Sequence, residues 1–310
     1  MISGGLLVLL MLLVDWSKAW EGLKSLPLEL AVAAMFVFAV QFVISTWKWD
    51  VSLRALDVRV PFGFLFRTYG VGAFFSTFLP SNVGGDVYRT YRTAGYCSFP
   101  VALAAVALER ILGLIALLLV ASLGVLWLLM RGGEISGSVF VAAAAFSITS
   151  YFLAPLIALH FLHGVRPWMQ RLPAKFSFVA AAHDVLHANR ARLLQLLAIC
   201  LLFQVVATGA VALLFAGVGI SWAIAESAVA NGAGSIAAIL PISINGLGIT
   251  EASFAGVASQ LNIGFTEAAM VSFLVRILVL PLIIGFAVTY VFGKQSEPVG
   301  ASAIAKVEVA

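Results

Sequence analysis

The chain has 310 residues, of which 62% are hydrophobic and only 10% are charged, and its mean hydropathy is +1.08. A soluble domain cannot bury so large an apolar fraction, because its own exterior must be largely polar. The net charge of +4 is not a nucleic-acid signature, since the basic residues gather in a few loops. The composition therefore excludes a soluble protein and predicts an all-α, polytopic transmembrane bundle.

The apolar runs predict where the chain crosses the membrane. The first run, residues 2–14, is short for a span and lacks the basic stretch that begins a signal peptide, so we expect a tilted or truncated first helix. The later runs are long enough to cross a bilayer core of ~30 Å at ~1.5 Å per residue. These predicted spans are 27–47, 100–130, 137–162, 193–217 and 267–292.

The basic residues set the expected orientation. The loops at 48–67 and 163–192 are rich in Lys and Arg, whereas the loops between the other spans hold few basic residues or balance them with acids. Under the positive-inside rule these two loops and the C-terminus lie in the cytoplasm. We therefore expect a multi-pass protein of the bacterial inner (plasma) membrane, with an interfacial amphipathic segment at 163–192 and a disordered cytoplasmic tail at 295–310.

Two further apolar segments, 62–96 and 223–262, are broken in the middle by Pro and Gly. Given the orientation of the spans, the first must start and end in the cytoplasm and the second must start and end outside. Two full spans in place of either segment also satisfy this parity, but the arms are short for a bilayer crossing. The pattern favours two re-entrant helical hairpins that enter from opposite faces.

The two breaks resemble one another. "LPSNVGGD" at 79–86 and "LPISINGLGITE" at 240–251 both run Leu-Pro, Ser, Asn, two glycines and an acid, and Arg110 and Arg276 follow the acid by 24 and 25 residues. Paired Pro/Gly-interrupted segments in corresponding halves are typical of inverted-repeat transporters, although Pro and Gly are common enough in membrane helices for chance to compete. The predicted domain, 1–294, then has half-repeats at about 27–130 and 193–294, joined by 137–192.

These residue types suit an anion site at membrane depth. Non-helical backbone there must line a cavity or be buried in protein, and helices restarting after Gly85 and near Thr250 present free N–H groups that favour a phosphate. Arg110 and Arg276 lie ~15 Å into their spans, where a charge needs a partner or a wet cavity.

A purely structural interpretation uses the same geometry. Asp86 and Glu251 occupy first helical turns, where acids stabilise the helix dipole. Arg110 then neutralises Asp86, and Arg276 neutralises Glu251. Both interpretations can hold together. Glu109 points about 100° away from its neighbour Arg110 around the helix, toward another helix, a proton path or the cytoplasmic interface.

Other motifs predict neither a metal nor a cofactor. His183 and His187 lie at i, i+4 without the Glu of a zinc-protease motif. Neither GxxxxGK[ST], HExxH nor GxSxG occurs, so we expect no ATP-driven transport by this chain, no catalytic residue and no enzymatic activity.

"FLPSNVGGDVYRTY" with "ALERILGL", and "LPISINGLGITEASF" with "FLVRILVLP", resemble the lysylphosphatidylglycerol synthase transmembrane domain family, also called flippase-like proteins. The resemblance runs from "VDW" at 14–16 to Lys294. It implies movement of aminoacylated phosphatidylglycerol or another lipid between leaflets, and the missing aminoacyl-transfer domain puts lipid lysylation out of reach. The matching motif positions are Pro80, Asn82, Gly84, Gly85, Asp86, Arg89, Glu109, Arg110, Pro241, Asn245, Gly246, Gly248, Glu251 and Arg276.

The predicted function is binding and flipping of an anionic phospholipid or a polyprenyl-phosphate-linked lipid at the bilayer midplane. Two alternatives stay open: an integral membrane transferase with Asp86 or Glu251 as base, and a scaffold for lipid- or glycan-synthesis enzymes. A homodimer or an enzyme partner is compatible with the sequence, and no nucleic-acid partner is expected.

Overall fold

The computed structural model describes residues 26–78, 83–131, 189–221, 223–239, 243 and 245–292, with a few positions between 14 and 24. Within these ranges the chain is helical and forms no strand. The helices are α3 (Leu28–Ala55), α4 (Phe62–Phe78), α5 (Val83–Thr93), α6 (Phe99–Met130), α10 (Arg190–Gly217), α11 (Ile224–Ala237), α12 (Ile249–Gln260) and α13 (Phe265–Phe292).

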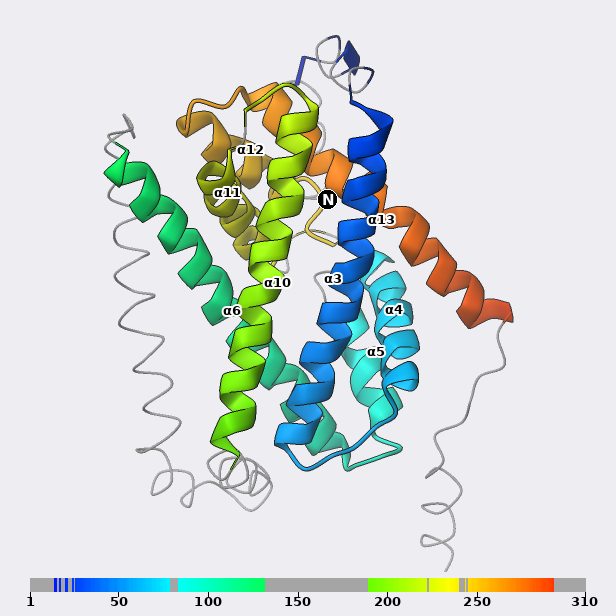
Figure 1. Ribbon diagram of the computed structural model, residues 1–310. Coiled ribbons are helices and arrows are strands. Elements are labelled where there is room, and N and C mark those ends of the chain that lie inside the picture. Colours follow the sequence, from blue (N-terminus) through cyan, green and yellow to red (C-terminus); the bar gives the residue numbers. More distant parts are fainter. Residues whose placement is uncertain are drawn as a thin grey trace, which may run out of the picture.

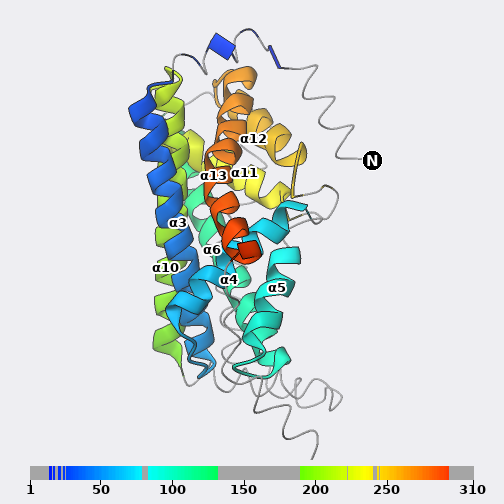
Figure 2. The same cartoon turned by 90° about the vertical axis from the view of Figure 1, so that its right-hand side faces the viewer.

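Four of the described helices, α3, α6, α10 and α13, are long and apolar enough to cross a membrane. They coincide with four of the five predicted spans. α3 and α10 run side by side along one side of the bundle (Figures 1 and 2), and α13 passes behind α3 and leans outward at a steep angle (Figure 1). The fifth predicted span, 137–162, and most of the amphipathic segment 163–192 lie outside the described residues, as does the tail.

Two short helical hairpins fill the space between the long helices. The pair α4 and α5 lies in the lower half of the bundle, and α11 with α12 lies in the upper half (Figure 1). Their helices have 17, 11, 14 and 12 residues, and at ~1.5 Å per residue each is shorter than a ~30 Å bilayer core. The pairs occupy the segments 62–96 and 223–262 that the Pro/Gly breaks single out.

Glycines allow the close contacts within each hairpin. α4 and α5 touch through their backbones, because a Cβ added to Gly85 would meet Ser76 Oγ and lie 2.5 Å from the carbonyl oxygen of Gly72. The turn before α12 is left-handed, with φ of +67° at Gly246 and +87° at Gly248, a conformation that costs glycine little. The chain can therefore reverse within a few residues inside the bundle.

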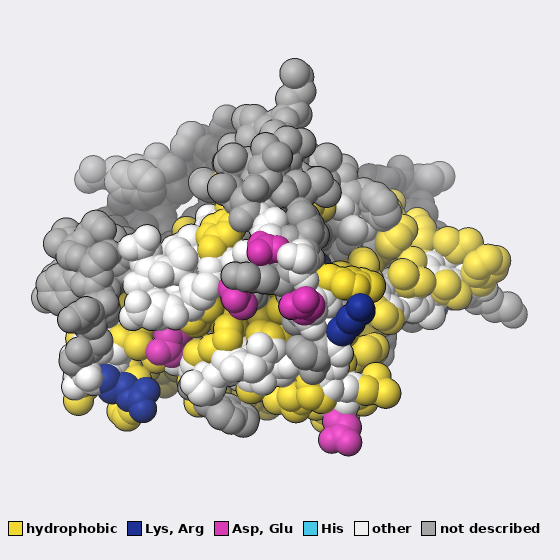
Figure 3. Space-filling model, turned by 90° about the horizontal axis from the view of Figure 1, so that it is seen from above, with side chains coloured by type: hydrophobic (Ala, Val, Ile, Leu, Met, Phe, Trp, Pro, Cys, Tyr) yellow, Lys and Arg dark blue, Asp and Glu magenta, His cyan; other side chains and the backbone are white. Residues whose placement is uncertain are grey.

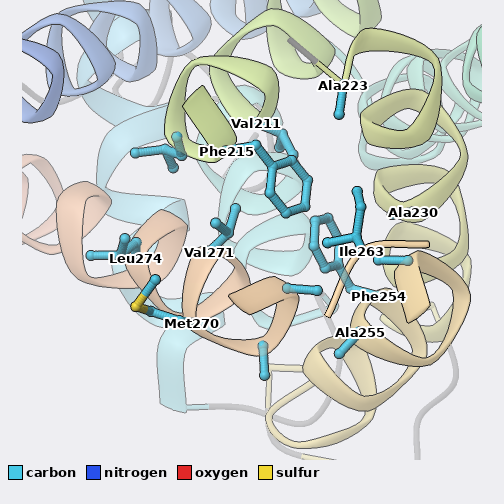
Figure 4. Packing of buried hydrophobic residues seen from close by; sticks show 14 of the residues in the cluster. Val211, Phe215, Ala223, Ala230, Phe254, Ala255, Ile263, Met270, Val271 and Leu274 are labelled. Carbon is cyan, nitrogen blue, oxygen red and sulfur yellow. The ribbon is translucent and has the colours of Figure 1, made fainter. Parts of the chain in front are cut away.

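The main core joins the upper hairpin to the long helices. The rings of Phe215 on α10 and Phe254 on α12 stack with centroids 5.9 Å apart, and Val271 and Leu274 of α13 pack beside them (Figure 4). These four side chains are buried at 4% exposure or less. The core holds α12 and α13 in fixed relation, which positions the turn before α12 and the residues of α13 that follow it.

One boundary differs from the prediction in a way that affects the site. The first span was expected to end at residue 47, with a basic loop from 48 to 67, but α3 continues to Ala55 and α4 already begins at Phe62. Charged residues are tolerated in this last part of α3 because they are paired: Arg54 with Asp50 at 2.9 Å, and Lys48 with Glu109 of α6 at 3.6 Å. Lys48 is therefore a buried member of the bundle.

Candidate lipid-headgroup site

A cavity of about 530 Å³ lies at the centre of the bundle, within the ~300–1,000 Å³ typical of ligand sites. Its walls come from six helices and from the turn before α12. They are formed by Phe38, Gln41, Phe42 and Ser45 of α3, Tyr69, Gly72, Ala73, Ser76 and Thr77 of α4, Gly85, Asp86 and Arg89 of α5, Arg110 of α6, Phe203 of α10, Asn245 and Leu247 of the turn, and Val275, Arg276, Val279, Leu280 and Ile283 of α13.

Asp86 is the acceptor for two arginines in this wall. Arg110 donates from Nε to Oδ2 at 3.0 Å and from Nη2 to Oδ1 at 2.8 Å, while Arg89 Nη2 donates to Oδ1 at 2.5 Å. The paired contact from Arg110 is the two-pronged geometry that makes guanidinium–carboxylate pairs strong. The Arg110 side chain nevertheless remains 48% exposed, so it stays accessible while paired.

Behind this pair lies a second, more buried set of charges. Arg89 Nη1 donates to Glu109 Oε2 at 2.8 Å, and Lys48 Nζ lies 3.6 Å from Glu109 Oε1. The Arg89 guanidinium also lies over the rings of Trp49 and Tyr69, with 5.1 and 4.7 Å to the centroids, a stabilising cation–π arrangement. This chain of contacts ties α3, α4, α5 and α6 together.

The second hairpin supplies a parallel arrangement. Arg276 Nε donates to Glu251 Oε1, and Arg276 Nη1 donates to the backbone oxygen of Asn245 at 3.0 Å. Glu251 is fully buried, and its Oε2 accepts the backbone N–H of Gly248 at 2.7 Å. Glu251 thus caps α12 with one carboxylate oxygen and orients Arg276 with the other.

The charges do not balance. The described residues of this network comprise four cations, Lys48, Arg89, Arg110 and Arg276, against three carboxylates, Asp86, Glu109 and Glu251, which leaves one net positive charge. Two of the carboxylates, Glu109 and Glu251, are buried behind the wall and not on it. The surface of the cavity is therefore cationic.

The structure brings together residues of the two predicted halves. Gly85, Asp86, Arg89, Arg110, Asn245 and Arg276 all line the one cavity. Gly84, Glu109, Gly246, Gly248 and Glu251 do not line it but adjoin or support residues that do. Pro80, Asn82 and Pro241 lie outside the described residues.

One part of the sequence interpretation is wrong. Free N–H groups were expected at helices that restart after Gly85 and near Thr250. However, α5 already begins at Val83, and the Gly85 N–H donates to Ser76 Oγ at 3.1 Å. The Gly248 N–H is taken by Glu251. Side chains of the protein therefore occupy the Gly85 and Gly248 donors, and the arginines present further donors to an anion on the cavity wall.

The sequence analysis also missed the contribution of α3. Gln41 and Ser45 line the cavity, and Lys48 supports it. With Ser52, whose Oγ donates to the backbone oxygen of Ala105 at 2.5 Å, they form a polar stripe at i, i+4, i+7 and i+11. This spacing puts all four side chains on one helical face, and it was visible in the sequence.

A protein-family model described as the lysylphosphatidylglycerol synthase TM region matches residues 1–286 of the chain. No curated protein and no solved structure gave a match.

Proposed function

The chain belongs to the lysylphosphatidylglycerol synthase TM-region family, and we propose that it binds an anionic lipid or lipid-linked intermediate in the central cavity and moves it between the leaflets of the membrane. Multi-pass membrane character follows from the four apolar helices and the family. Binding and translocation are the proposal.

The cationic cavity wall carries this proposal. Arg89, Arg110 and Arg276 reach one cavity from three helices, and buried carboxylates hold two of them in place. A guanidinium matches the geometry of phosphate oxygens, and ionisable groups at membrane depth are retained mainly for function. A phosphate that enters the cavity meets oriented donors and an uncompensated positive charge.

The hairpins suggest how such a lipid changes leaflet. We infer that α4–α5 and α11–α12 are re-entrant hairpins of an inverted repeat, with half-repeats at about 27–130 and 193–294. In support, their helices are too short to cross a bilayer, they occupy opposite halves of the bundle, and both breaks reach the same cavity. Discontinuous helices around a central site are a common basis of alternating access.

The charge distribution supports an orientation in the bacterial inner membrane with the C-terminus in the cytoplasm. Acidic side chains spread over the upper end (Figure 3), where α3, α11 and α13 start with Glu29, Glu226 and Glu267. Basic residues mark the lower end, among them Arg54 and Arg92 in the last turns of α3 and α5. The positive-inside rule makes the lower end cytoplasmic.

The direct test reconstitutes the purified protein in vesicles that contain acyl-labelled fluorescent phosphatidylglycerol and follows leaflet exchange by quenching from outside. Arg110→Ala and Arg276→Ala are expected to slow exchange by about tenfold or more, as loss of about 1.4 kcal/mol of phosphate binding requires. Arg131→Ala is the matched control, because Arg131 is exposed at the end of α6 and does not line the cavity. Exchange as fast as wild type in both cavity variants would show that this mechanism is wrong.

A further inference from the structure

We propose that the headgroup accepted by the cavity carries one net negative charge and no ammonium group, as a phosphodiester with a hydroxylated headgroup does. The inference rests on the proposed function and narrows its substrate class. It separates this chain from a carrier of lysylphosphatidylglycerol, whose headgroup combines one phosphate with two amines.

Each carboxylate among the described residues of the network already has a cationic partner. Asp86 accepts from both Arg89 and Arg110. Glu109 is shared by Arg89 and Lys48. Glu251 is held by Arg276 and by the Gly248 N–H. The break residues that the structure does not describe, 79–82, 240–242 and 244, contain no Asp or Glu.

An incoming ammonium group would have to share Asp86 with the two arginines that already hold it, or displace an arginine from a buried acid. For Glu109 and Glu251 this means opening an ion pair whose acid is 4% exposed or less. Removing one partner of a buried pair leaves an uncompensated charge, which is strongly destabilising. The ammonium would also face the net positive charge of the cavity. Both effects disfavour the binding of a headgroup that carries an amine.

The net charge of the network matches that of a monoanion. Four cations face three carboxylates, so one phosphodiester anion brings the network to neutrality. A zwitterionic headgroup leaves the net positive charge of the network in place. A diphosphate brings more negative charge than is needed to neutralise it. Because charge imbalance is costly away from water, the monoanion is the best-matched occupant.

The uncharged part of the wall is polar in places. Gln41 lines the cavity, and a glutamine amide both donates and accepts hydrogen bonds. Thr77, which donates to the Ala73 backbone oxygen at 3.1 Å, keeps oxygen lone pairs that can accept from a hydroxyl group. Such a wall suits a hydroxylated headgroup.

A lipid fits this site better than a soluble phosphodiester. Leu280 of α13 lines the cavity, and it shares a helix face with Ile277 and Ile284, which are 54% and 57% exposed and do not line it. The cavity therefore borders on surface that an acyl chain can follow into the bilayer. A headgroup in the cavity remains attached to a chain outside it.

The test compares acyl-labelled phosphatidylglycerol with acyl-labelled lysylphosphatidylglycerol in the same vesicles. Phosphatidylglycerol should exchange at least about tenfold faster. Gln41→Glu adds an unpaired carboxylate to the wall and removes the net positive charge. It should therefore lower the ratio of the phosphatidylglycerol exchange rate to the lysylphosphatidylglycerol exchange rate by about tenfold. Gln260→Glu is the matched control, because Gln260 is exposed at the end of α12, away from the cavity; it should leave the ratio unchanged.

A binding measurement separates this inference from transport itself. Native mass spectrometry of the detergent-solubilised protein, offered equal amounts of the two lipids, should show retained phosphatidylglycerol in at least about tenfold excess, with the soluble phosphodiester glycerophosphoglycerol unable to displace it. If neither lipid exchanges but this preference holds, flipping is wrong and the headgroup class stands. If lysylphosphatidylglycerol is retained or exchanged as well as phosphatidylglycerol, or Gln41→Glu does not shift the ratio, the headgroup class is wrong. Displacement by glycerophosphoglycerol would overturn the lipid as the source of the phosphodiester.

Discussion

Arg89 of α5 donates to Glu109 of α6 at 2.8 Å, and the two side chains are only 3% and 4% exposed. They lie 20 residues apart and join the first hairpin to the span that follows it. Because two long charged side chains are ordered in the interior, the pair fixes the position of α5, and with it Asp86, relative to Arg110.

Removal of one member of this pair should destabilise the protein. Arg89→Ala leaves Glu109 buried with Lys48 as its remaining described cation, and breaking a buried pair costs about 3–5 kcal/mol. We expect a clear fall in the thermal unfolding midpoint in detergent. Arg54→Ala breaks the Arg54–Asp50 pair, whose arginine is 46% exposed, and should cost no more than about 1 kcal/mol. Equal effects would mean that the buried pair does not hold α5.

Under the proposed function Asp86 competes with the lipid headgroup for Arg110, so its substitution should have a distinct phenotype. Asp86→Asn removes the charge that Arg110 and Arg89 share and raises the positive excess of the cavity. Phosphatidylglycerol should then be retained roughly threefold to tenfold more strongly in native mass spectrometry, while its leaflet exchange slows, because release becomes harder. Asp50→Asn, near the end of α3 and outside the cavity wall, is the comparison. Weaker retention by Asp86→Asn would contradict a competing role for this acid.

The glycine contact between α4 and α5 should not tolerate a methyl group. Gly85→Ala places Cβ against Ser76 Oγ and 2.5 Å from the backbone oxygen of Gly72, so the two helices must separate, at about 1–3 kcal/mol. Gly113→Ala on α6 meets nothing within 4 Å and gains helix propensity. The thermal unfolding midpoint should therefore fall for Gly85→Ala and should not fall for Gly113→Ala. A neutral Gly85→Ala would show that the hairpin can open at this point without loss.

Labelling of Cys97 tests on which side of the membrane the first hairpin ends. Cys97 lies between α5 and α6, partly exposed, and burial raises the pKa of its thiol. Since the thiolate is the reactive form, labelling by an impermeant maleimide should be slow at neutral pH and accelerate as the pH rises toward the raised pKa. In a Cys200→Ala background, inside-out vesicles should label and right-side-out spheroplasts should not. Labelling from the outside would contradict the proposed orientation, in which the end of the first hairpin faces the cytoplasm.

The sequence predicted the architecture well where hydrophobicity decides it. The limits of α6, α10 and α13 agree with the apolar runs to within a few residues, and the two hairpins fall on the Pro/Gly breaks. The end of α3 was misplaced, because Lys48 and Arg54 look like loop residues until their partners are known. Those partners, Glu109 and Asp50, satisfy the charges locally, and a hydropathy pattern does not contain that information.

The candidate site was predictable in part for a related reason. Recurrence of the acid and the downstream arginine pointed to both ion pairs, Asp86–Arg110 and Glu251–Arg276. The role of Arg89 as the bridge between Asp86 and Glu109 depends on the angle between α5 and α6. Tertiary packing sets that angle, so the order of contacts within the network was not accessible from spacing alone.

The single uncompensated charge of the network would also make the proposed transport cycle depend on the membrane voltage. A protein that carries a monoanionic headgroup has a neutral centre and is indifferent to membrane voltage. The empty protein is not, because a full elementary charge moved across the membrane is worth about 2.3 kcal/mol per 100 mV. The voltage sensitivity of a complete cycle would therefore reside in the return of the unloaded form, and an electrically polarised cell would bias the direction of net lipid flow without any nucleotide hydrolysis.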